Sequence, residues 1–363
     1  MRKHLKRFLA PLAKKTILAA KAGGFLERVL TETKVFTPTH KIGEFSNLNN
    51  EVFPLYSGYR DFVVPGWRGM TKPDSGELHI PDSITASKAI ALAENSTAQT
   101  LRFLDIMGFS ISGKNVLEIG CYDGTRSFSL AAAGAGKVLG SDVTAYYVRQ
   151  TISQAEENMT VSATQDKHYR NGLDRIRDYY KATIPHRSGA VAFADDDISE
   201  TSLFPESYDC IFSFEVLEHV QNPEKVFRNI GKLLKPGGFA FHEYNPFFAM
   251  NGGHSLCTLD FPWGHASLSP AGFKAYLQQF RPAEINVAWQ FYTHNLNRMA
   301  VADMHTFSAQ AGLKTLSCIF WPEHAHMQAL SNETLCTVNK IYPNVTINDL
   351  ISPTVWVLHV KPT

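Results

Sequence analysis

A carboxylate stands inside an apolar run of the chain, beside a glycine-containing turn. The stretch "VLEIGCYDGTRSFSLA" (residues 116–131) is typical of a buried strand that passes through a turn into an alanine-rich helix. Gly120 and Gly124 flank the turn, and such a turn lets a ligand approach the backbone and the amides that open the helix. The dinucleotide fingerprint GxGxxG is absent, because Tyr122 stands where its second glycine would be. Glu118 therefore favours a ligand whose nearest part carries an amino group and not a phosphate.

Acidic residues also end the next strands along the chain. "KVLGSD" ends in Asp142, 18 positions after Gly124, and its carboxylate could accept hydrogen bonds from both hydroxyls of a ribose. "AVAFADDDIS" ends in three aspartates, residues 195–197, and "YDCIFSFEVLEHV" follows as a fourth strand. Taken singly, a carboxylate at a strand end is as well explained as the N-cap of the next helix. Their joint spacing favours a nucleotide-like ligand at the carboxyl edge of a mostly parallel sheet.

At this point the chain resembles the Rossmann-like S-adenosylmethionine-dependent methyltransferases. The resemblance is carried by "VLEIGCYDG", "VLGSD", "DDDIS", "SYDCIFSFEVLEHVQNPEKVFRNIGKLLKPGGFAFHE", "FSAQAGLKTLSCIFW" and "TVWVLHVKP". It covers roughly residues 100 to 360 in the family's order and spacing. It implies an α/β fold with a doubly wound, mostly parallel seven-stranded sheet, and S-adenosyl-L-methionine as cofactor.

The same resemblance implies roles for individual residues. Glu118 would hold the amino acid end of the cofactor, with Gly120 and Gly124 close to the sulfonium, and Asp142 would hold the ribose. Two further contacts are implied for adenine: Asp197 with its exocyclic amine, or Asp196 if the register slips by one, and Ile198 with the ring. Phe214, after the fourth strand, would lie near the cofactor. Tyr122 departs from the family pattern and leaves the shape of the turn open.

Substrate recognition must come from what is added to this core. We expect an N-terminal extension over residues 1–100 and a methyltransferase domain over 101–363, with substrate-capping insertions near 151–188 and 245–300. Methyl transfer to oxygen needs a base, for which histidine is suited. His265 and His254 are the candidates, with His265 slightly ahead because Trp263 and Gly264 adjoin it. Either histidine could instead only order its loop, and transfer to nitrogen or carbon would depend on positioning more than on a base.

"FEVLEHV" raises the question of a metal ion. Glu215, Glu218 and His219 could share a helical face. A similar cluster, joined by a downstream histidine, binds magnesium in small-RNA 2′-O-methyltransferases and is echoed in ubiquinone-pathway O-methyltransferases. The motif also occurs widely in relatives without a metal, so we leave the metal unassigned and expect no magnesium dependence.

Composition limits the partners. The chain has 363 residues, 44% hydrophobic, with 35 Lys and Arg against 34 Asp and Glu, so no strong charge selects a nucleic acid. Five widely spaced cysteines without a CxxC pair argue against a disulfide framework and favour a reducing compartment. No acidic residue precedes Glu27 in a basic first segment. That segment is a solvated extension, the reading we prefer, or a helix lying on anionic lipid, or a targeting presequence.

These observations predict an S-adenosylmethionine-dependent methyltransferase acting on a small-molecule or glycan-like acceptor, with O-methylation preferred. The alternatives are a non-catalytic cofactor-binding adaptor and a magnesium-assisted 2′-O-methyltransferase acting on RNA. The expected location is cytoplasmic, with the inner face of a membrane as the site of any peripheral contact.

Overall fold

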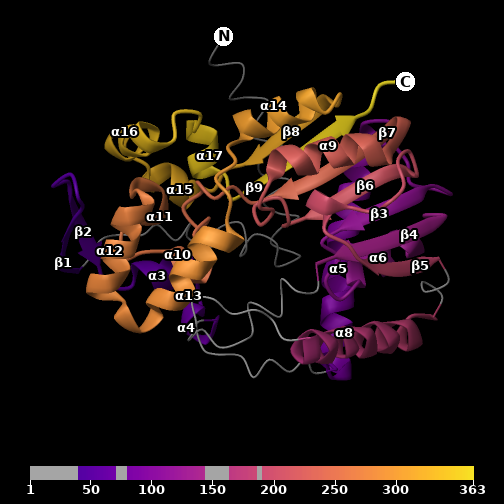
Figure 1. Ribbon diagram of the computed structural model, residues 1–363, viewed down its shortest axis with the longest axis horizontal. Helices are drawn as coiled ribbons and strands as arrows, with labels where there is room; N and C mark the ends of the chain where they lie inside the picture. Colours follow the sequence, from indigo (N-terminus) through magenta and orange to yellow (C-terminus); the bar gives the residue numbers. More distant parts are fainter. Residues whose placement is uncertain (1–39, 71–79, 144–162, 186–189) are drawn as a thin grey trace, which may run out of the picture.

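Seven strands form the central sheet of the computed structural model, in the order β5-β4-β3-β6-β7-β9-β8 (Figure 1). All neighbouring strands are parallel except β9, which runs antiparallel to both β7 and β8. The sheet comprises β3 (Asn115–Ile119), β4 (Lys137–Asp142), β5 (Val191–Asp195), β6 (Tyr208–Phe214), β7 (Leu234–Tyr244), β8 (Lys314–Trp321) and β9 (Thr354–Val360). The predicted doubly wound, mostly parallel seven-stranded sheet is confirmed.

The structure describes residues 40–70, 80–143, 163–185 and 190–363. The basic first segment lies outside these residues, so the preferred solvated extension and its alternatives, a helix on anionic lipid or a presequence, stay predictions. No helix in the described ranges is long and apolar enough to cross a bilayer.

Strand alternation directs side chains to two different layers of helices. Leu117 and Ile119 pack toward α9 (Pro223–Leu233) and α14 (Val301–Gln310), which cover one face. Val116 and Phe212 pack on the other face with α5 (Ser83–Ile106) and α6 (Thr125–Ala132). Glu118 has the parity of Val116 and so points to the α6 side.

Helix ends follow from local sequence. Asp82 caps α5 by accepting the N–H groups of Ile84 and Thr85, and Gly108, just after the helix, takes the left-handed φ of 83° that glycine allows. The α5 helix runs across residue 100, the boundary predicted for the extension, and the division of the chain there stays a prediction.

Three separate segments build a second lobe, which we call the cap: residues 40–70, 245–296 and 324–351. Its buried residues form one apolar cluster that includes Phe45, Phe247, Trp263 and Leu350. Since one segment leaves directly from the end of β7, the cap lies beside the carboxyl edge of the sheet (Figure 1). Its elements are β1 (Lys41–Ser46), β2 (Val52–Tyr56), α3 (Tyr59–Val63), α4 (Trp67–Met70), α10 (His254–Cys257), α11 (Gly264–Ser267), α12 (Pro270–Phe280), η3 (Pro282–Glu284), α13 (Ile285–Gln290), η4 (Phe291–Asn295), α15 (His324–Ala329), α16 (Asn332–Ile341) and α17 (Ile347–Ile351).

The β1–β2 hairpin replaces the irregular structure that glycine and proline suggest for this part of the chain. Phe45 and Leu55 are buried against the cap, and the Phe45 ring meets Tyr276 edge-on at 5.3 Å. Aromatic burial therefore outweighs the local turn signals.

The insertion near 151–188 contributes one described helix, α8 (Ala163–Thr183), and η2 (Ile198–Glu200) follows β5. The guanidinium of Arg177 donates to the carbonyl of Tyr122 at 2.8 Å. This contact ties α8 to the turn after β3.

Candidate functional site

A cavity of about 410 Å³ lies at the carboxyl ends of β3, β4, β5 and β6, which we call the strand-end pocket. The strand order reverses between β3 and β6, and ligands of open parallel sheets bind at such a switch point. Four of the residues predicted to bind the cofactor line this pocket: Gly120, Asp142, Asp197 and Ile198.

Two backbone amides hold the Asp142 carboxylate. Oδ2 accepts the N–H of Tyr122 at 2.5 Å and Oδ1 accepts that of Val143 at 2.7 Å. These two bonds fix the direction of the carboxylate, whose oxygens are acceptors of the kind that a ribose hydroxyl needs. Tyr122, the departure from the family pattern, takes a φ of 43° and leaves its side chain 40% exposed.

The three consecutive aspartates differ in what they offer the pocket. Asp195 pairs with Arg170. Asp196 bonds Ser202 through Oδ1, and its Oδ2 is buried. Asp197 is exposed, and its Oδ1 accepts the N–H of Ser199 at 2.8 Å as the cap of η2. Asp196 and Asp197 both line the strand-end pocket, so the choice of Asp197 for the adenine amine stays a prediction.

Glu118 lies beneath the strand-end pocket and not in its wall. The side chain is 2% exposed, and its carboxyl group accepts a short hydrogen bond from Ser127 on α6. Burial raises the pKa of Glu118 to about 8, although the Ser127 hydrogen bond lowers it. A neutral carboxyl at pH 7 therefore underlies the turn, and its predicted contact with the amino group stays a prediction.

Besides Glu118, two other predicted cofactor residues do not line the pocket. Phe214 points to the α6 face, where the Arg126 guanidinium lies 4.0 Å from the centre of its ring. Gly124 begins α6 at a φ of 84°, and a Cβ there would collide with the Phe193 ring. Phe214 points to the α6 face because it has the same strand parity as Phe212. Glycine is required at position 124 because the start of α6 lies close to the Phe193 ring.

The pocket suits S-adenosylmethionine by the chemistry of its walls. Asp142 and Asp197 offer acceptors for hydroxyl and amino groups, and Ile198 and Val216 offer apolar contact. Among the described residues no Lys or Arg lines the pocket, which accords with a cationic ligand.

A second cavity, of about 250 Å³, adjoins the first and is lined by Glu218, Asn245, Asn251 and His254, among others. We call it the histidine pocket. Glu215 and His219 line both cavities. The two pockets therefore meet at one glutamate and one histidine.

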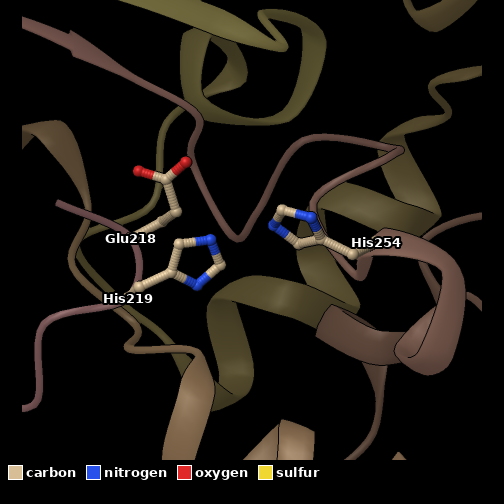
Figure 2. Close-up of side chains that lie close together, drawn as sticks. All are labelled: Glu218, His219 and His254. Atoms are coloured by element: carbon tan, nitrogen blue, oxygen red, sulfur yellow. The ribbon is translucent and has the colours of Figure 1, made fainter. Parts of the chain in front are cut away.

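Glu218, His219 and His254 present ligand atoms that all lie within 4.8 Å of one another. Figure 2 shows the two imidazole rings facing each other, with the Glu218 carboxylate to one side. Glu218 is fully buried, and neither of its carboxylate oxygens has a hydrogen-bond partner of normal geometry. Burial raises its pKa well above the ordinary value, opposed by the nearby N–H groups of Glu218 itself and Asn245. A bare buried carboxylate beside two imidazoles is a donor set that suits a divalent cation.

Neighbouring groups orient these side chains. The carbonyl oxygen of Asn295 lies 2.6 Å from His219 Nδ1, and since a carbonyl only accepts, Nδ1 carries the hydrogen and Nε2 is left as an acceptor. The Asn245 amide donates to Glu215 at 3.2 Å. Burial lowers the pKa of His219, and it lowers the pKa of His254 to about 3. Both imidazoles are neutral near pH 7, the form that binds metal ions.

Two residues that line the pockets have a strained backbone. Glu215 has a φ of 56° and His254 a φ of 50°, in a region that residues with a Cβ seldom adopt. Such residues persist where the surrounding structure fixes them, often at functional sites. Nothing in the sequence marks either position as left-handed.

The preference for His265 is corrected by the structure. His265 is 1% exposed, its Nε2 donates to the Phe247 carbonyl at 2.8 Å, and it lines neither pocket. Burial lowers its pKa to about 4. Trp263, one of the neighbours that favoured His265, is fully buried in the cap and donates to the Leu350 carbonyl. His265 orders its loop, and of the two candidates it is His254 that lines the histidine pocket.

Sequence reasoning missed Val216 and Asn251 as pocket residues. Val216 directly follows Glu215, so its place after the fourth strand could have drawn attention to it. Asn251 lies in an irregular stretch whose path is set by the cap.

A family model described as "Methyltransferase domain" matches residues 93–300, more than half of the chain. The ubiquinone biosynthesis O-methyltransferase of Chromobacterium violaceum is 28% identical over 227 residues, covering 62% of this chain and 76% of that protein. A mitochondrial ubiquinone biosynthesis O-methyltransferase of Dictyostelium discoideum is 28% identical over 131 residues, covering 36% of this chain and 35% of that protein.

Coverage of other relatives is also partial. The ribosomal protein L11 methyltransferase of Pseudomonas aeruginosa is 26% identical over 39% of this chain and 43% of that protein, so the chain spans less than half of several curated relatives. A crystal structure of an S-adenosylmethionine-dependent methyltransferase from Mesorhizobium loti has a TM-score of 0.41 at 14% identity, covering 71% of this chain and 96% of that one. The matched domain, together with the sheet order, decides the family. The chain belongs to the methyltransferase domain family, and its cofactor is S-adenosylmethionine.

Proposed function

We propose that the protein is an S-adenosylmethionine-dependent methyltransferase that methylates an oxygen atom of a small-molecule or glycan-like acceptor. The single observation that carries the proposal is the junction of the two pockets at Glu215 and His219. A cofactor in the strand-end pocket and an acceptor in the histidine pocket would meet there. Methyl transfer gains most of its rate from holding two reactants at such a junction.

The protein's own residues bind and orient the reactants. Asp142 and Asp197 hold the cofactor through its hydroxyl and amino groups, and Val216 packs between the pockets. The cofactor supplies an electrophilic methyl group when bound. Asn245 and Asn251 offer amide groups that can fix an acceptor hydroxyl in the histidine pocket.

A divalent cation forms part of the proposal. Glu218, His219 and His254 would hold it, since burial keeps both imidazoles neutral and neither Glu218 oxygen has a hydrogen bond of normal geometry. The cation would supply Lewis acidity that favours the deprotonated acceptor oxygen. The structure thus leads us to propose the opposite of the metal independence expected from sequence.

A second candidate is transfer to nitrogen. The histidine pocket contains Glu215 and Glu218, and among the described residues no Lys or Arg lines it. A protonated amine suits such a pocket without any metal ion. The same lack of cations offers no contact for the phosphates of RNA in either pocket.

The test uses the full chain, labelled S-adenosylmethionine and fractionated cell extract as the source of acceptor. We expect transfer that chelator abolishes and Mg²⁺ or Mn²⁺ restores, and a loss of about 100-fold or more in Glu218→Gln and His254→Ala. His324→Ala, an exposed histidine of the cap, is the matched control. Transfer insensitive to chelator supports the amine acceptor, whereas cofactor binding in calorimetry without any labelled product supports the adaptor.

A further inference from the structure

Two segments distant in sequence meet behind the histidine pocket. The turn after β6, residues 217–221, carries Glu218 and His219, and residues 294–297 follow from η4 in the cap. His219 contacts the Asn295 carbonyl, and the amide of Gln221 donates to the carbonyl of His294. The cap therefore holds the turn along its length.

Asn297 makes the densest set of these contacts. Its Nδ2 donates to the carbonyls of Leu217 at 2.6 Å and Val220 at 2.9 Å. Its backbone N–H donates to the carbonyl of Glu218 at 2.8 Å, and its Oδ1 accepts the N–H of Met299 at 3.0 Å. One residue thus satisfies three carbonyls of the turn.

These carbonyls bracket the two pocket residues. Leu217 precedes Glu218, and Val220 follows His219, so the single amide group fixes the ends of the dipeptide between them. The turn is neither helix nor strand, and Glu215, two residues before it, has a left-handed conformation. The shape of the turn is therefore not set by a regular hydrogen-bond ladder. A side-chain amide can replace that ladder.

The same contacts set the tautomer of His219. Asn297 lies two residues after Asn295, whose carbonyl accepts from His219 Nδ1. While Asn297 is bonded to the turn, the Asn295 carbonyl is kept opposite that nitrogen. Nε2 is then the ring atom left to act in the pocket.

We propose that Asn297 is a positioning residue that holds Glu218 and His219 in the geometry the histidine pocket requires. It acts through the turn and touches neither cofactor nor acceptor. The proposal rests on the function proposed above for its effect on catalysis, but its effect on His219 is independent of any activity.

The first measurement is the histidine spectrum of ¹⁵N-labelled full-length protein, with His219 assigned from the signals lost in His219→Gln. The wild type should show His219 in a fixed Nδ1–H tautomer. Asn297→Ala should give signals averaged between tautomers, and Asn297→Ser, which keeps one donor, should fall between. Asn344→Ala is the matched control, because this exposed amide donates to Asp303 and lies outside both pockets.

The second measurement is methyl transfer. Asn297→Ala should lower kcat about 10- to 100-fold, as removal of orienting groups does, with calorimetric affinity for S-adenosylhomocysteine within about twofold of wild type. Unfolding midpoints of both Asn297 variants establish that they are folded, and Asn297→Ser carries the test if Asn297→Ala is not. Unchanged His219 signals and unchanged kcat would overturn the proposal. A changed tautomer in a protein whose wild type transfers no methyl group would refute the proposed function and leave the positioning role standing.

Discussion

Gly120 and Val216 are in such close contact that no other residue fits at position 120. A Cβ on Gly120 would collide with Cγ2 of Val216 and lie 3.0 Å from Cγ1, and the backbone there has a φ of 73°. The turn after β3 and the turn after β6 are thereby packed against each other beneath the strand-end pocket. The contact joins the cofactor side of the site to the turn that carries the glutamates and His219.

Gly120→Ala should therefore destabilise the protein by about 2 to 4 kcal/mol, from overpacking together with left-handed strain. Denaturant unfolding measures the loss. Gly312→Ala is the control, since its φ is 75° but a Cβ there meets nothing within 4 Å, and it should show only the strain, about 1 to 2 kcal/mol. Equal losses in the two variants would mean that the Val216 contact contributes nothing.

Asp142 and Asp197 should contribute to cofactor affinity, and Asp196 should not. Asp142→Ala removes an acceptor that two backbone amides hold in place, and should weaken binding by about 1.5 to 3 kcal/mol. Asp197→Asn should weaken binding less, since one acceptor oxygen remains. Calorimetry with S-adenosylhomocysteine checks all three. A larger effect in Asp196→Asn than in Asp197→Asn would show that the aspartate register is shifted by one.

Cofactor binding should release a proton at pH 7. Glu118 is protonated there because burial raises its pKa to about 8, and an ammonium group brought close would favour the charged carboxylate. Calorimetry of S-adenosylhomocysteine in buffers of different ionisation enthalpy measures the release, and Glu118→Gln should abolish it. No release from the wild type would mean that Glu118 serves only its bond to Ser127.

Two buried histidines should make stability depend on pH. His242 and His359 are fully buried with rings 5.6 Å apart, and burial lowers the pKa of His359 to about 3 and that of His242 well below its ordinary value. Below about pH 6.5 the unfolded chain binds protons that the folded protein refuses, so the free energy of unfolding should fall as pH decreases toward 3. Above pH 6.5 their contribution is constant.

His359→Phe should make that acid slope shallower. Denaturant unfolding between pH 5 and 7.5 compares it with wild type and with the exposed-histidine variant His324→Gln. A slope that is equally steep in all three proteins would assign the acid sensitivity to other groups, such as carboxylates that hydrogen bonds and ion pairs keep ionised in the folded protein.

The rate of methyl transfer should not follow an ordinary imidazole ionisation. A base at His254 with unperturbed chemistry would make the rate rise near pH 6.5, but burial lowers its pKa to about 3. We therefore expect no step from His254 between pH 6 and 8 in kcat of the cation-loaded protein. A step near 6.5 that disappears in His254→Ala would show that the histidine is more accessible to water than its burial indicates.

The sheet was predictable because its signals are local. Alternating apolar strands, each ending in an acidic residue, were enough to place Asp142 and Asp197 at one edge. The side to which Phe214 points could not be predicted, because it depends on strand parity, which the motif alone does not give. His254 and His265 could not be ranked, since both lie in irregular sequence and only the packing of three distant cap segments shows which of them reaches a pocket.

The cap was not predicted as one unit, because two of its segments fall in a predicted N-terminal extension and in a separate insertion. Its core joins Phe45, Phe247 and Leu350 from three parts of the chain. No periodicity links such residues, because their contacts arise from burial and not from local spacing.

Glu215 and His219 form a wall common to the strand-end pocket and the histidine pocket. Whatever charge or hydrogen bond one occupant imposes on this wall is present when the other occupant arrives. Thermodynamic linkage then requires each to alter the affinity of the other by the same factor. If the acceptor raises the affinity for the cofactor, the cofactor raises the affinity for the acceptor by the same factor. The order of addition would then leave the final complex unchanged, but the saturation curve of each ligand would depend on the concentration of the other.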